Sequence, residues 1–429
     1  MNCDSMANVL NFLHTCKGSY NNSTYKLDGV KFLFKKLNID NLDGIVIHVG
    51  GTNGKGSTCA MLESIYRGAG YSTGLCTSPH LLRINERIQF NREEISDKDF
   101  VKLFKIVNKV VQHIHAHNPT IKISFFEYEI AMALLYFKEK KPNVIILEVG
   151  LGGRLDATNA TRTDISVLTS ISFDHEDMLG ETISSIAREK AGIIRRENKV
   201  IVGRNLPSEA MLEIEKIVDE KSATMVIAKD LLPITLTPRY QNHNASIAHR
   251  VAKELTDKLM LSEEQIINGI LTFKWAARWQ IFDLNNDEKL DKIEKKRKNK
   301  VIIDGAHNEA GAIAIADEIT TIYGQNKPIV IFASNYVSRA SRMLKILASI
   351  SLKIYLTKSM HDLCLSQDEL VKCFPIDSNC EYEYIASDRI MDIVLSDINQ
   401  NNIVITGSLY LAGDIIKQFL SIGLKSTLT

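Results

Sequence analysis

One segment near the N-terminus constrains the fold more than any other part of this chain. Residues 45–49 form a short β-branched run, Ile-Val-Ile-His-Val, that leads directly into a glycine-rich string at residues 50–57. A stretch with helical character follows from residue 55 to residue 67. A strand, a tight glycine loop and a helix in this order predict an α/β fold in which the helix begins beside the end of a buried strand.

The same alternation of strand and helix continues along the chain. Continuous apolar runs of this length suit strands of a parallel sheet that are buried on both faces. The further candidate strands are residues 144–149, 165–169, 200–202, 301–304, 329–332 and 403–406. Residues 126–137 and 309–322 have helical periodicity and are expected to cover the sheets. The sequence therefore predicts an α/β protein with mostly parallel sheets.

A dense charge run at residues 285–300 marks a change in composition. Such runs are more often solvated loops or hairpin tips than binding patches, and this one is expected at or just past a domain boundary. A chain of 429 residues is long enough for two or three domains, at roughly 100–200 residues each. We expect a large N-terminal α/β domain over residues 1–280 and a smaller C-terminal α/β domain over residues 281–429.

The overall composition excludes several classes of protein. Hydrophobic residues make up 45% and charged residues 24% of the chain, with a net charge of +1, which argues against a dedicated binder of nucleic acid or membrane surfaces. No apolar run is long enough to span a membrane, and the N-terminus does not resemble a signal peptide. The seven cysteines fit no zinc module and are expected to be reduced thiols. These features predict a soluble cytoplasmic protein, and we expect it to be a monomer.

The glycine-rich loop has the chemistry of a phosphate-binding site. Backbone N–H groups and the dipole at a helix N-terminus attract phosphate oxygens. Glycines at positions 51, 54 and 56 allow the backbone to approach them closely. Lys55 supplies a cation for the outer phosphates, and Ser57 supplies a hydroxyl near the helix start. The alternative is a glycine-rich turn with a chance lysine.

The spacing of this loop departs from a standard phosphate loop, because Gly56 separates Lys55 from Ser57. The string resembles the Mur ligase superfamily. Within that superfamily, a loop with this inserted glycine resembles the folylpolyglutamate synthase and dihydrofolate synthase branch. The resemblance implies a central ATP-binding domain with a pteroate site, followed by a C-terminal α/β domain, and it assigns Gly54, Lys55, Gly56 and Ser57 to ATP.

A carboxylate ends the candidate strand at residues 144–149. Glu148 lies where open α/β sheets bind ligands, and Mg²⁺ prefers oxygen ligands of this kind. A salt-bridged structural glutamate is the alternative. The family resemblance implies two Mg²⁺ sites, to which Ser78, Glu148 and His175 contribute. It also implies that Lys190 is carbamylated, which would turn a cation into an anionic oxygen ligand.

The family resemblance also marks a pteroate side. The run from Glu148 to Asn159 is similar to a family motif in which Leu155, Asp156 and Ala157 would line the pterin site. Asp156 would accept hydrogen bonds from pterin nitrogens. A second matching segment contains four expected pocket residues, namely Ser124, Phe125, Phe126 and Glu127. Without the resemblance, its adjacent aromatic residues would indicate core packing.

Further family motifs surround Asn244, Arg278, Asp304 and His307, and the resemblance implies that these residues contact ATP. Arg278 would lie on the γ-phosphate side, where a fixed guanidinium stabilises developing charge. The sequence departs from the family pattern at residues 333–339, where the family usually has a different segment. The conspicuous histidines at positions 113, 115 and 117 are expected to be a solvated helix end rather than a metal site.

The expected function is ATP-dependent ligation of L-glutamate to dihydropteroate and to folates through an acyl phosphate. Phosphoryl transfer mainly needs positioning and charge neutralisation, so Lys55, Lys190, Arg278 and His175 are the expected catalytic residues. One alternative is a Mur-type ligase that acts on another carboxylate. Such enzymes usually have an additional N-terminal domain, and only 44 residues precede the first strand here. A phosphate-loop switch and a non-catalytic pterin-binding protein are further alternatives.

Overall fold

The computed structural model describes residues 4–16, 27–230, 232–282, 300–397, 401–424 and 426–427. Apart from Lys300, the charge run therefore lies outside the described residues, as does Cys3. The chain forms two compact units. The first contains Met1–Ile234 and Gln241–Phe273, and the second contains Thr235–Tyr240 and Lys274–Thr429. The main changeover after Phe273 comes slightly earlier than the expected division after residue 280.

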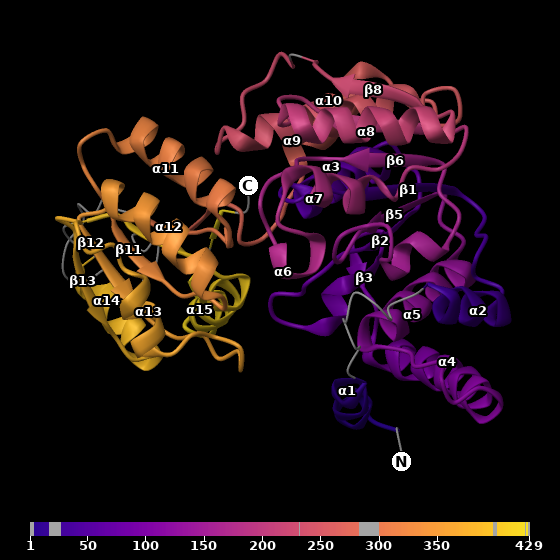
Figure 1. Ribbon diagram of the computed structural model, residues 1–429, viewed down its shortest axis with the longest axis horizontal. Coiled ribbons are helices and arrows are strands. Elements are labelled where there is room, and N and C mark those ends of the chain that lie inside the picture. Colours follow the sequence, from indigo (N-terminus) through magenta and orange to yellow (C-terminus); the bar gives the residue numbers. More distant parts are fainter. Residues whose placement is uncertain are drawn as a thin grey trace. The chain divides into compact units, whose positions relative to one another are not determined.

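The described part of the first unit is built on an eight-stranded sheet with the order β4-β3-β2-β5-β1-β6-β7-β8 (Figure 1). Six of these strands, β2, β5, β1, β6, β7 and β8, run parallel to one another. The other two, β3 and β4, extend the sheet beyond β2 in antiparallel fashion. The strands are β1 (Ile45–Gly50), β2 (Thr73–Cys76), β3 (Ile88–Phe90), β4 (Glu93–Glu94), β5 (Val144–Glu148), β6 (Ile165–Leu168), β7 (Lys199–Gly203) and β8 (Thr224–Ala228).

Helices cover both faces of this sheet, and its apolar strands are buried as their sequences require. Val46, Ile145 and Leu147 belong to one cluster with α1, α2, α4 and α5, whereas α10 packs on α3 and α7 packs on α8. The helices are α1 (Met6–Thr15), α2 (Asp28–Leu37), α3 (Lys55–Gly68), α4 (Asp97–His117), α5 (Phe125–Lys140), α6 (Glu176–Leu179), α7 (Ile183–Ala191), α8 (Ser208–Lys221), α9 (Tyr240–Glu254) and α10 (Glu263–Thr272), with 3₁₀ turns η1 (Ile84–Arg87) and η2 (Ala157–Ala160).

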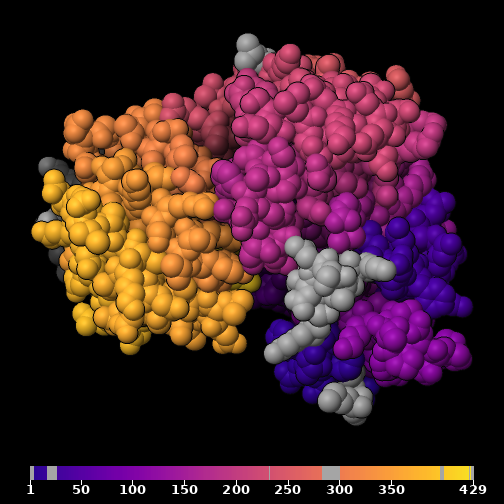
Figure 2. Space-filling model, viewed as in Figure 1, coloured from indigo at the N-terminus to yellow at the C-terminus, as the bar shows by residue number. Residues whose placement is uncertain are grey.

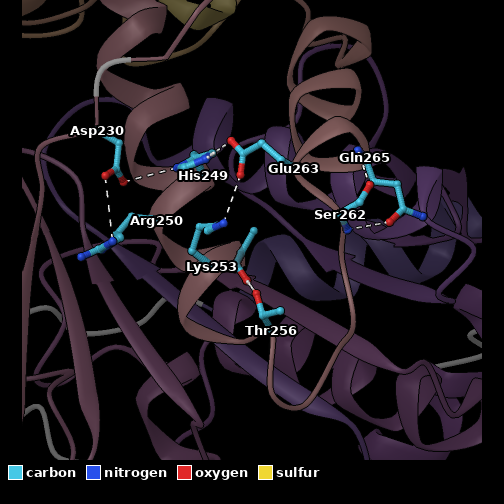
Figure 3. A network of polar contacts seen from close by, with 9 residues as sticks. Asp230, His249, Arg250, Lys253, Thr256, Ser262, Glu263 and Gln265 are labelled. Carbon is cyan, nitrogen blue, oxygen red and sulfur yellow. Dashed lines mark hydrogen bonds and ion pairs between the residues drawn. The ribbon is translucent and has the colours of Figure 1, made fainter.

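A polar network connects α9 with the start of α10 (Figure 3). The His249 ring on α9 lies between two carboxylates, with Nδ1 3.3 Å from Asp230 Oδ2 and Nε2 2.7 Å from Glu263 Oε1. Lys253, one turn further along α9, donates to Glu263 Oε2 at 3.1 Å. These contacts fix α9 relative to the segment that follows β8 and to the first turn of α10.

The second unit has a seven-stranded sheet with the order β13-β12-β11-β14-β10-β9-β15 in its described part. Five of these strands, β13, β12, β11, β14 and β10, run parallel to one another. The other two, β9 and β15, extend the sheet beyond β10 in antiparallel fashion. The strands are β9 (Gln280–Phe282), β10 (Val301–Ile303), β11 (Ile329–Phe332), β12 (Lys353–Leu356), β13 (Glu381–Tyr384), β14 (Ile403–Thr406) and β15 (Ser426–Thr427).

The core of the second unit lies between this sheet and its helices. Ile302, Val330 and Val404 from three neighbouring strands join one buried cluster with side chains of α11 and α12. The helices are α11 (Glu309–Tyr323), α12 (Val337–Ile350), α13 (Gln367–Cys373), α14 (Ile390–Asp397) and α15 (Leu409–Ser421), with the 3₁₀ turn η4 (Ser387–Arg389). The orange and yellow surface in Figure 2 belongs mainly to this unit.

The predicted α/β fold with mostly parallel sheets is confirmed. Each predicted strand is present within one or two residues of its expected bounds, and the predicted helices become α3, α5 and α11. The histidines at positions 113, 115 and 117 are exposed at the end of α4, where a solvated helix end was expected. Within the described ranges, the structure contains no helix long and apolar enough to cross a membrane.

Candidate functional site

The glycine-rich loop leaves β1 and ends at the N-terminus of α3. Gly51 and Gly54 have φ values of +136° and +86°, in the region that favours glycine. Gly54 is the N-cap residue, and Lys55, Gly56 and Ser57 form the first turn of α3. The first N–H groups of a helix have no partners within the helix. The structure therefore places these donors and the positive end of a helix dipole at the predicted phosphate site.

Residues that follow β6 hold the shape of this loop. Thr52 N donates to Ser170 O at 2.7 Å, and Asn53 N donates to Ser170 Oγ at 2.9 Å. Asn53 O accepts a hydrogen bond from Thr169 Oγ1 at 2.7 Å. A Cβ atom at Gly51 would lie 2.1 Å from Thr169 Oγ1, so this close approach requires glycine. The loop conformation is therefore defined before any ligand binds.

Two lysines converge on one carbonyl oxygen of the loop. Lys55 Nζ and Lys190 Nζ both lie 3.1 Å from Gly51 O, and Lys55 also donates to Thr52 O at 3.0 Å. Burial and the Lys55 charge together lower the pKa of Lys190 to about 7, although Asp174 and Asp156 act in the opposite direction. A substantial fraction of Lys190 is therefore a neutral amine near pH 7.

Helix α9 supplies polar side chains to the same loop. A Cβ atom at Gly54 would lie 2.3 Å from Asn244 Oδ1, so Asn244 packs directly on the loop backbone. Gln241 Nε2 donates to Ser57 Oγ at 3.2 Å, and Gln241 Oε1 accepts from Asn244 Nδ2 at 2.8 Å. The structure thus brings Asn244 to the phosphate loop, where the sequence predicts an ATP contact.

Glu148 and Ser78 lie next to each other at the ends of the neighbouring strands β5 and β2. Glu148 is only 5% exposed, and its Oε2 accepts a hydrogen bond from Ser78 N at 3.0 Å. Burial raises the pKa of the nearby Cys59 thiol; the Glu148 charge raises it further and the Lys55 charge lowers it. Glu148 and Lys55 therefore influence the same small region beside the phosphate loop.

His175 follows β6 and forms the N-cap of α6 with a φ of +49°. Its neighbour Asp174 is buried and exerts its charge on Lys190. Among the described residues, no group of three or more histidine, cysteine or carboxylate side chains is arranged to hold a metal ion. A divalent cation at Glu148 or His175 would therefore take much of its coordination from other oxygen donors, as Mg²⁺ commonly does.

The two predicted pteroate segments lie together. A Cβ atom at Gly150 would be 2.5 Å from Phe126 Cζ, so the loop after β5 runs against the Phe126 ring. Phe125, Phe126 and Leu155 pack against the hydrophobic cluster that contains Ala157. Packing thus joins the start of α5 to the segment around η2, although they are separated in sequence.

Polar residues of these segments already have partners within the chain. Ser124 caps α5: its N and Oγ donate to Glu127 Oε2 at 2.7 and 2.8 Å, and it accepts from Glu127 N at 3.3 Å. Asp156 Oδ1 accepts from Thr158 N and Oγ1 at 3.0 and 2.5 Å, and its Oδ2 accepts from Leu151 N at 2.9 Å. Burial raises the pKa of Asp156, and these hydrogen bonds lower it. The side chains of Ser124, Glu127 and Asp156 therefore hold the backbone conformation of their own segments.

The predicted residues of the second unit form their own cluster. Asp304 is buried at the end of β10; its Oδ2 accepts from Tyr240 Oη at 2.5 Å and from Trp279 N at 2.9 Å. Burial raises the pKa of Asp304, and the Arg278 charge lowers it. Arg278 Nη1 donates to Ala277 O at 2.9 Å, and His307 Nδ1 lies 2.9 Å from Gly305 O. Asp304 therefore organises the segment that carries Arg278.

Sequence reasoning missed several residues that shape the site. Thr169 and Ser170 buttress the phosphate loop, Gln241 reaches Ser57, and Arg87 forms a buried ion pair with Glu129. Each of these contacts joins segments that are far apart along the chain. The strand end before Thr169 was a detectable signal, because loops at the carboxyl edge of a parallel sheet lie close together.

Comparison with known proteins defines the class. Residues 49–230 match the family model described as the Mur ligase middle domain, and residues 286–418 match that of the dihydrofolate synthetase C-terminal domain. The fold is thus that of a Mur-type ligase, which forms carbon–nitrogen bonds.

Individual relatives narrow this class. The dihydrofolate synthase/folylpolyglutamate synthase of Bacillus subtilis is 30% identical over 86% of this chain and 89% of its own. The dihydrofolate synthetase of Saccharomyces cerevisiae is 28% identical over 87% and 92%, respectively. Escherichia coli FolC in complex with DHPP and ADP has a TM-score of 0.83 at 26% identity and 98% coverage of both chains. The chain belongs to the dihydrofolate synthase/folylpolyglutamate synthase family.

Proposed function

We propose that this protein uses ATP to join L-glutamate to the carboxylate of dihydropteroate and to the glutamate tail of folates. The observation that carries this proposal is the arrangement at the carboxyl edge of the first sheet. There the phosphate loop with Lys55 lies beside a buried carboxylate, Glu148, that is bonded to Ser78. A nucleotide phosphate and a divalent cation are the ligands that such a combination recognises.

The relatives support the ligand classes. Besides the FolC complex with DHPP and ADP, a bifunctional folylpolyglutamate synthase/dihydrofolate synthase structure contains Mn, AMPPNP and L-glutamate. That structure has a TM-score of 0.80 at 25% identity and covers 97% of this chain and 98% of its own. By this likeness, Mg²⁺ or a similar divalent cation accompanies ATP in the protein described here.

The reaction follows from the chemistry of the loop. The N–H groups at the start of α3, Lys55 and Ser57 bind the ATP phosphates, with Asn244 beside them. An oxygen of the acceptor carboxylate attacks the γ-phosphorus, and the bond to the departing ADP breaks. The glutamate amine then attacks the acyl carbon, phosphate leaves, and the amine loses a proton to the surrounding water. Preorganised donors stabilise the charge that develops at each step.

Residues of the second unit have ATP roles in this proposal. Arg278 stabilises charge at the γ-phosphate, and Asp304 and His307 contact the nucleotide. The structural support is the buried carboxylate of Asp304, which organises the backbone next to Arg278 through Trp279 N. A fixed guanidinium is better suited to this task than a flexible one, since less ordering is needed during the reaction.

We assign the divalent cations to Ser78, Glu148, His175 and a carbamylated Lys190, in two sites. The donor set fits Mg²⁺, because it consists mainly of oxygen atoms and leaves room for phosphate and water. When bound, the cations would neutralise charge on the transferring phosphate. Glu148 is the firmest member of this set, since its buried carboxylate lies at the carboxyl end of a parallel strand, beside Ser78, where α/β sheets bind ligands.

Carbamylation of Lys190 is supported by its protonation state. The neutral amine nitrogen attacks the carbon of CO₂, a nitrogen–carbon bond forms, and one proton is released. A lysine with an ordinary pKa is almost entirely charged at pH 7 and unreactive, whereas the pKa of Lys190 is lowered to about 7. The product is a carbamate anion beside the phosphate loop, which relieves the repulsion between Lys190 and Lys55.

The pteroate site in this proposal lies between the start of α5 and the segment around η2. Phe125, Phe126, Leu155 and Ala157 supply its apolar walls, and Ser124, Glu127 and Asp156 supply its polar frame. A flat pterin suits aromatic walls of this kind. We further propose that the enzyme acts as a monomer in the cytoplasm. The free thiols of the six cysteines that the structure describes are in keeping with a reducing compartment.

Purified full-length protein tests the proposal directly. It is incubated with Mg-ATP, L-glutamate and either dihydropteroate or tetrahydrofolate, and the ligated product and ADP are quantified. We expect turnover of both acceptors, and product formation should disappear on chelation of the divalent cation. No turnover of dihydropteroate would leave only the polyglutamylating activity, and ADP formation that ignores both acceptors would contradict the proposal.

A further inference from the structure

A buried ion pair lies at the start of α5, in the part of the first unit that is proposed to bind pteroate. Arg87, the last residue of η1, donates from Nη1 to Glu129 Oε2 at 2.5 Å. The Arg87 side chain is 12% exposed and that of Glu129 is 1% exposed. Because desolvated charges require each other, Glu129 fixes the position of the Arg87 guanidinium.

A second hydrogen bond fixes the orientation of the same guanidinium. Arg87 Nε donates to His80 Nδ1 at 2.8 Å. A guanidinium N–H is always a donor, so Nδ1 must accept and the proton of the neutral imidazole lies on Nε2. Within the described part of the chain, Arg87 Nη2 takes part in no hydrogen bond. Two nitrogen atoms of the guanidinium, Nε and Nη1, are therefore hydrogen-bonded within the protein, and Nη2 remains for a ligand.

The aromatic ring of Phe125 lies beside this fork. Phe125 and Glu129 are four residues apart on α5 and share one face of the helix. The Arg87 Cζ atom is 5.7 Å from the centroid of the Phe125 ring. On α1, the His14 ring is parallel to the Phe125 ring within 11°, with a centroid separation of 5.8 Å. Nitrogen donors thus gather around one partly buried aromatic surface.

Such a grouping matches a ligand with an aromatic ring and a carboxylate. Arginine binds carboxylates strongly because its N–H groups fit their oxygen atoms. The Phe125 ring is only partly buried and can contact an aromatic ring of the ligand. Pteroate has a ring and one carboxylate, but that carboxylate is bonded directly to the ring and is the group that reacts with ATP. A folate has the ring and the additional carboxylates of its glutamate, so only a folate offers Arg87 a carboxylate besides the one that reacts.

We propose that Arg87, positioned by Glu129 and His80, binds a carboxylate of the glutamate already attached to a folate, beside Phe125. This inference rests on the proposed function and assigns Arg87 as the residue that distinguishes glutamylated from unglutamylated acceptors. Arg87 then contributes to folates as substrates and contributes little to dihydropteroate, which has no glutamate. The same pocket accepts both molecules, and one guanidinium sets their relative affinity.

Equilibrium binding to the full chain tests this assignment without requiring turnover. Pteroate and pteroylglutamate differ by one glutamate, and the ratio of their Kd values is measured for the wild type and for Arg87→Met. We expect the wild type to prefer pteroylglutamate. Loss of one charge-assisted hydrogen bond should reduce that preference by about 10- to 100-fold, while the Kd of pteroate changes by less than about threefold.

Matched variants separate recognition from folding. Arg83→Met removes an arginine four residues earlier, whose ion pair with Asp97 at 3.0 Å is exposed, and should leave the ratio unchanged. Glu129→Gln retains the shape of the side chain and removes the charge that holds Arg87, so it should reduce the preference in the same direction. Arg87→Lys should restore part of it. Each variant's Kd for ATP serves as a check that the phosphate loop is intact.

Three results would overturn the assignment. They are a wild type without preference for pteroylglutamate, an Arg87→Met variant that keeps the wild-type ratio, and equal weakening of both ligands, which would indicate a purely structural ion pair. None of these results is the same as failure of the proposed function. That failure would appear as an absence of ATP-dependent ligation by the wild type with either acceptor.

Discussion

The phosphate loop and the pteroate segments of the first unit are built in opposite ways. In the loop, side chains from elsewhere hold the backbone, as Thr169 Oγ1 does for Asn53 O. In the pteroate segments, the motif residues hold their own backbone, as Ser124 and Glu127 do at the start of α5. In the loop, the helix N–H donors thus remain for a ligand, whereas much of the hydrogen-bonding capacity of the pteroate residues is already used.

The comparison shows that polar residues of a binding motif can have two different roles. A polar residue in a binding motif either contacts the ligand or shapes the segment that does so. Asp156 accepts hydrogen bonds from Thr158 and Leu151, so at least part of its role is the second one. The apolar neighbours Phe126 and Leu155 are the stronger candidates for direct pteroate contact.

The largest expected effect concerns the loop side of the comparison. Lys55→Ala removes a cation from the phosphates, and kcat should fall by about 10²- to 10³-fold, as for the loss of one preorganised donor. The thermal unfolding midpoint should change little. Lys102→Ala, which removes an exposed lysine paired with Glu139, is the control. Full ligation by Lys55→Ala would remove the phosphate assignment.

On the pteroate side, Asp156→Ala should act first on stability. It leaves the N–H and hydroxyl of Thr158 and the N–H of Leu151 without their acceptor, at about 1–3 kcal/mol for each buried donor. At about 2–4 °C per kcal/mol, we expect Tm to fall by at least about 6 °C. An unchanged Tm together with lost pteroate binding would show that Asp156 serves the ligand alone, and the contrast between the two regions would disappear.

Ser124→Ala sharpens the same comparison with a smaller change. Loss of an N-cap costs about 1 kcal/mol, so Tm should fall by about 2–4 °C. The KM for dihydropteroate should stay within about threefold of the wild type. Ser96→Ala removes the equivalent cap of α4, where Ser96 Oγ accepts from Asp99 N at 3.0 Å. A rise in KM for Ser124→Ala without a similar rise for Ser96→Ala would show that Ser124 contacts the substrate.

A pH dependence of stability is expected from Lys190. Its pKa is about 7 in the folded protein and near 10.5 in the unfolded chain, so the unfolded state binds more protons between these values. The destabilising effect of Lys190 is complete below pH 7 and fades as the pH rises. In buffers free of CO₂, the Tm of the wild type should increase relative to that of Lys190→Met from pH 7 to pH 9. Parallel Tm profiles would contradict the lowered pKa.

Sequence patterns predicted the parts of the molecule that have strong local signals. The apolar runs of β1 and β5 predict buried strands, and the glycines after β1 predict a tight loop before a helix. Strand β13 gave no such signal, because Glu381 and Glu383 alternate with tyrosines along an exposed edge strand. Arg87 and Glu129 are 42 residues apart, and their pairing depends on how β3 and α5 pack. No local pattern encodes that distance.

The hydrogen bonds of the phosphate loop also have a thermodynamic consequence. Fixing one backbone residue costs about 1–2 kcal/mol in conformational entropy. Thr52 and Asn53 are already held by Ser170, so this ordering occurs when the protein folds and not when nucleotide arrives. Nucleotide binding should therefore have only a small contribution from loop ordering, and amide exchange in the loop should already be slow in the free protein.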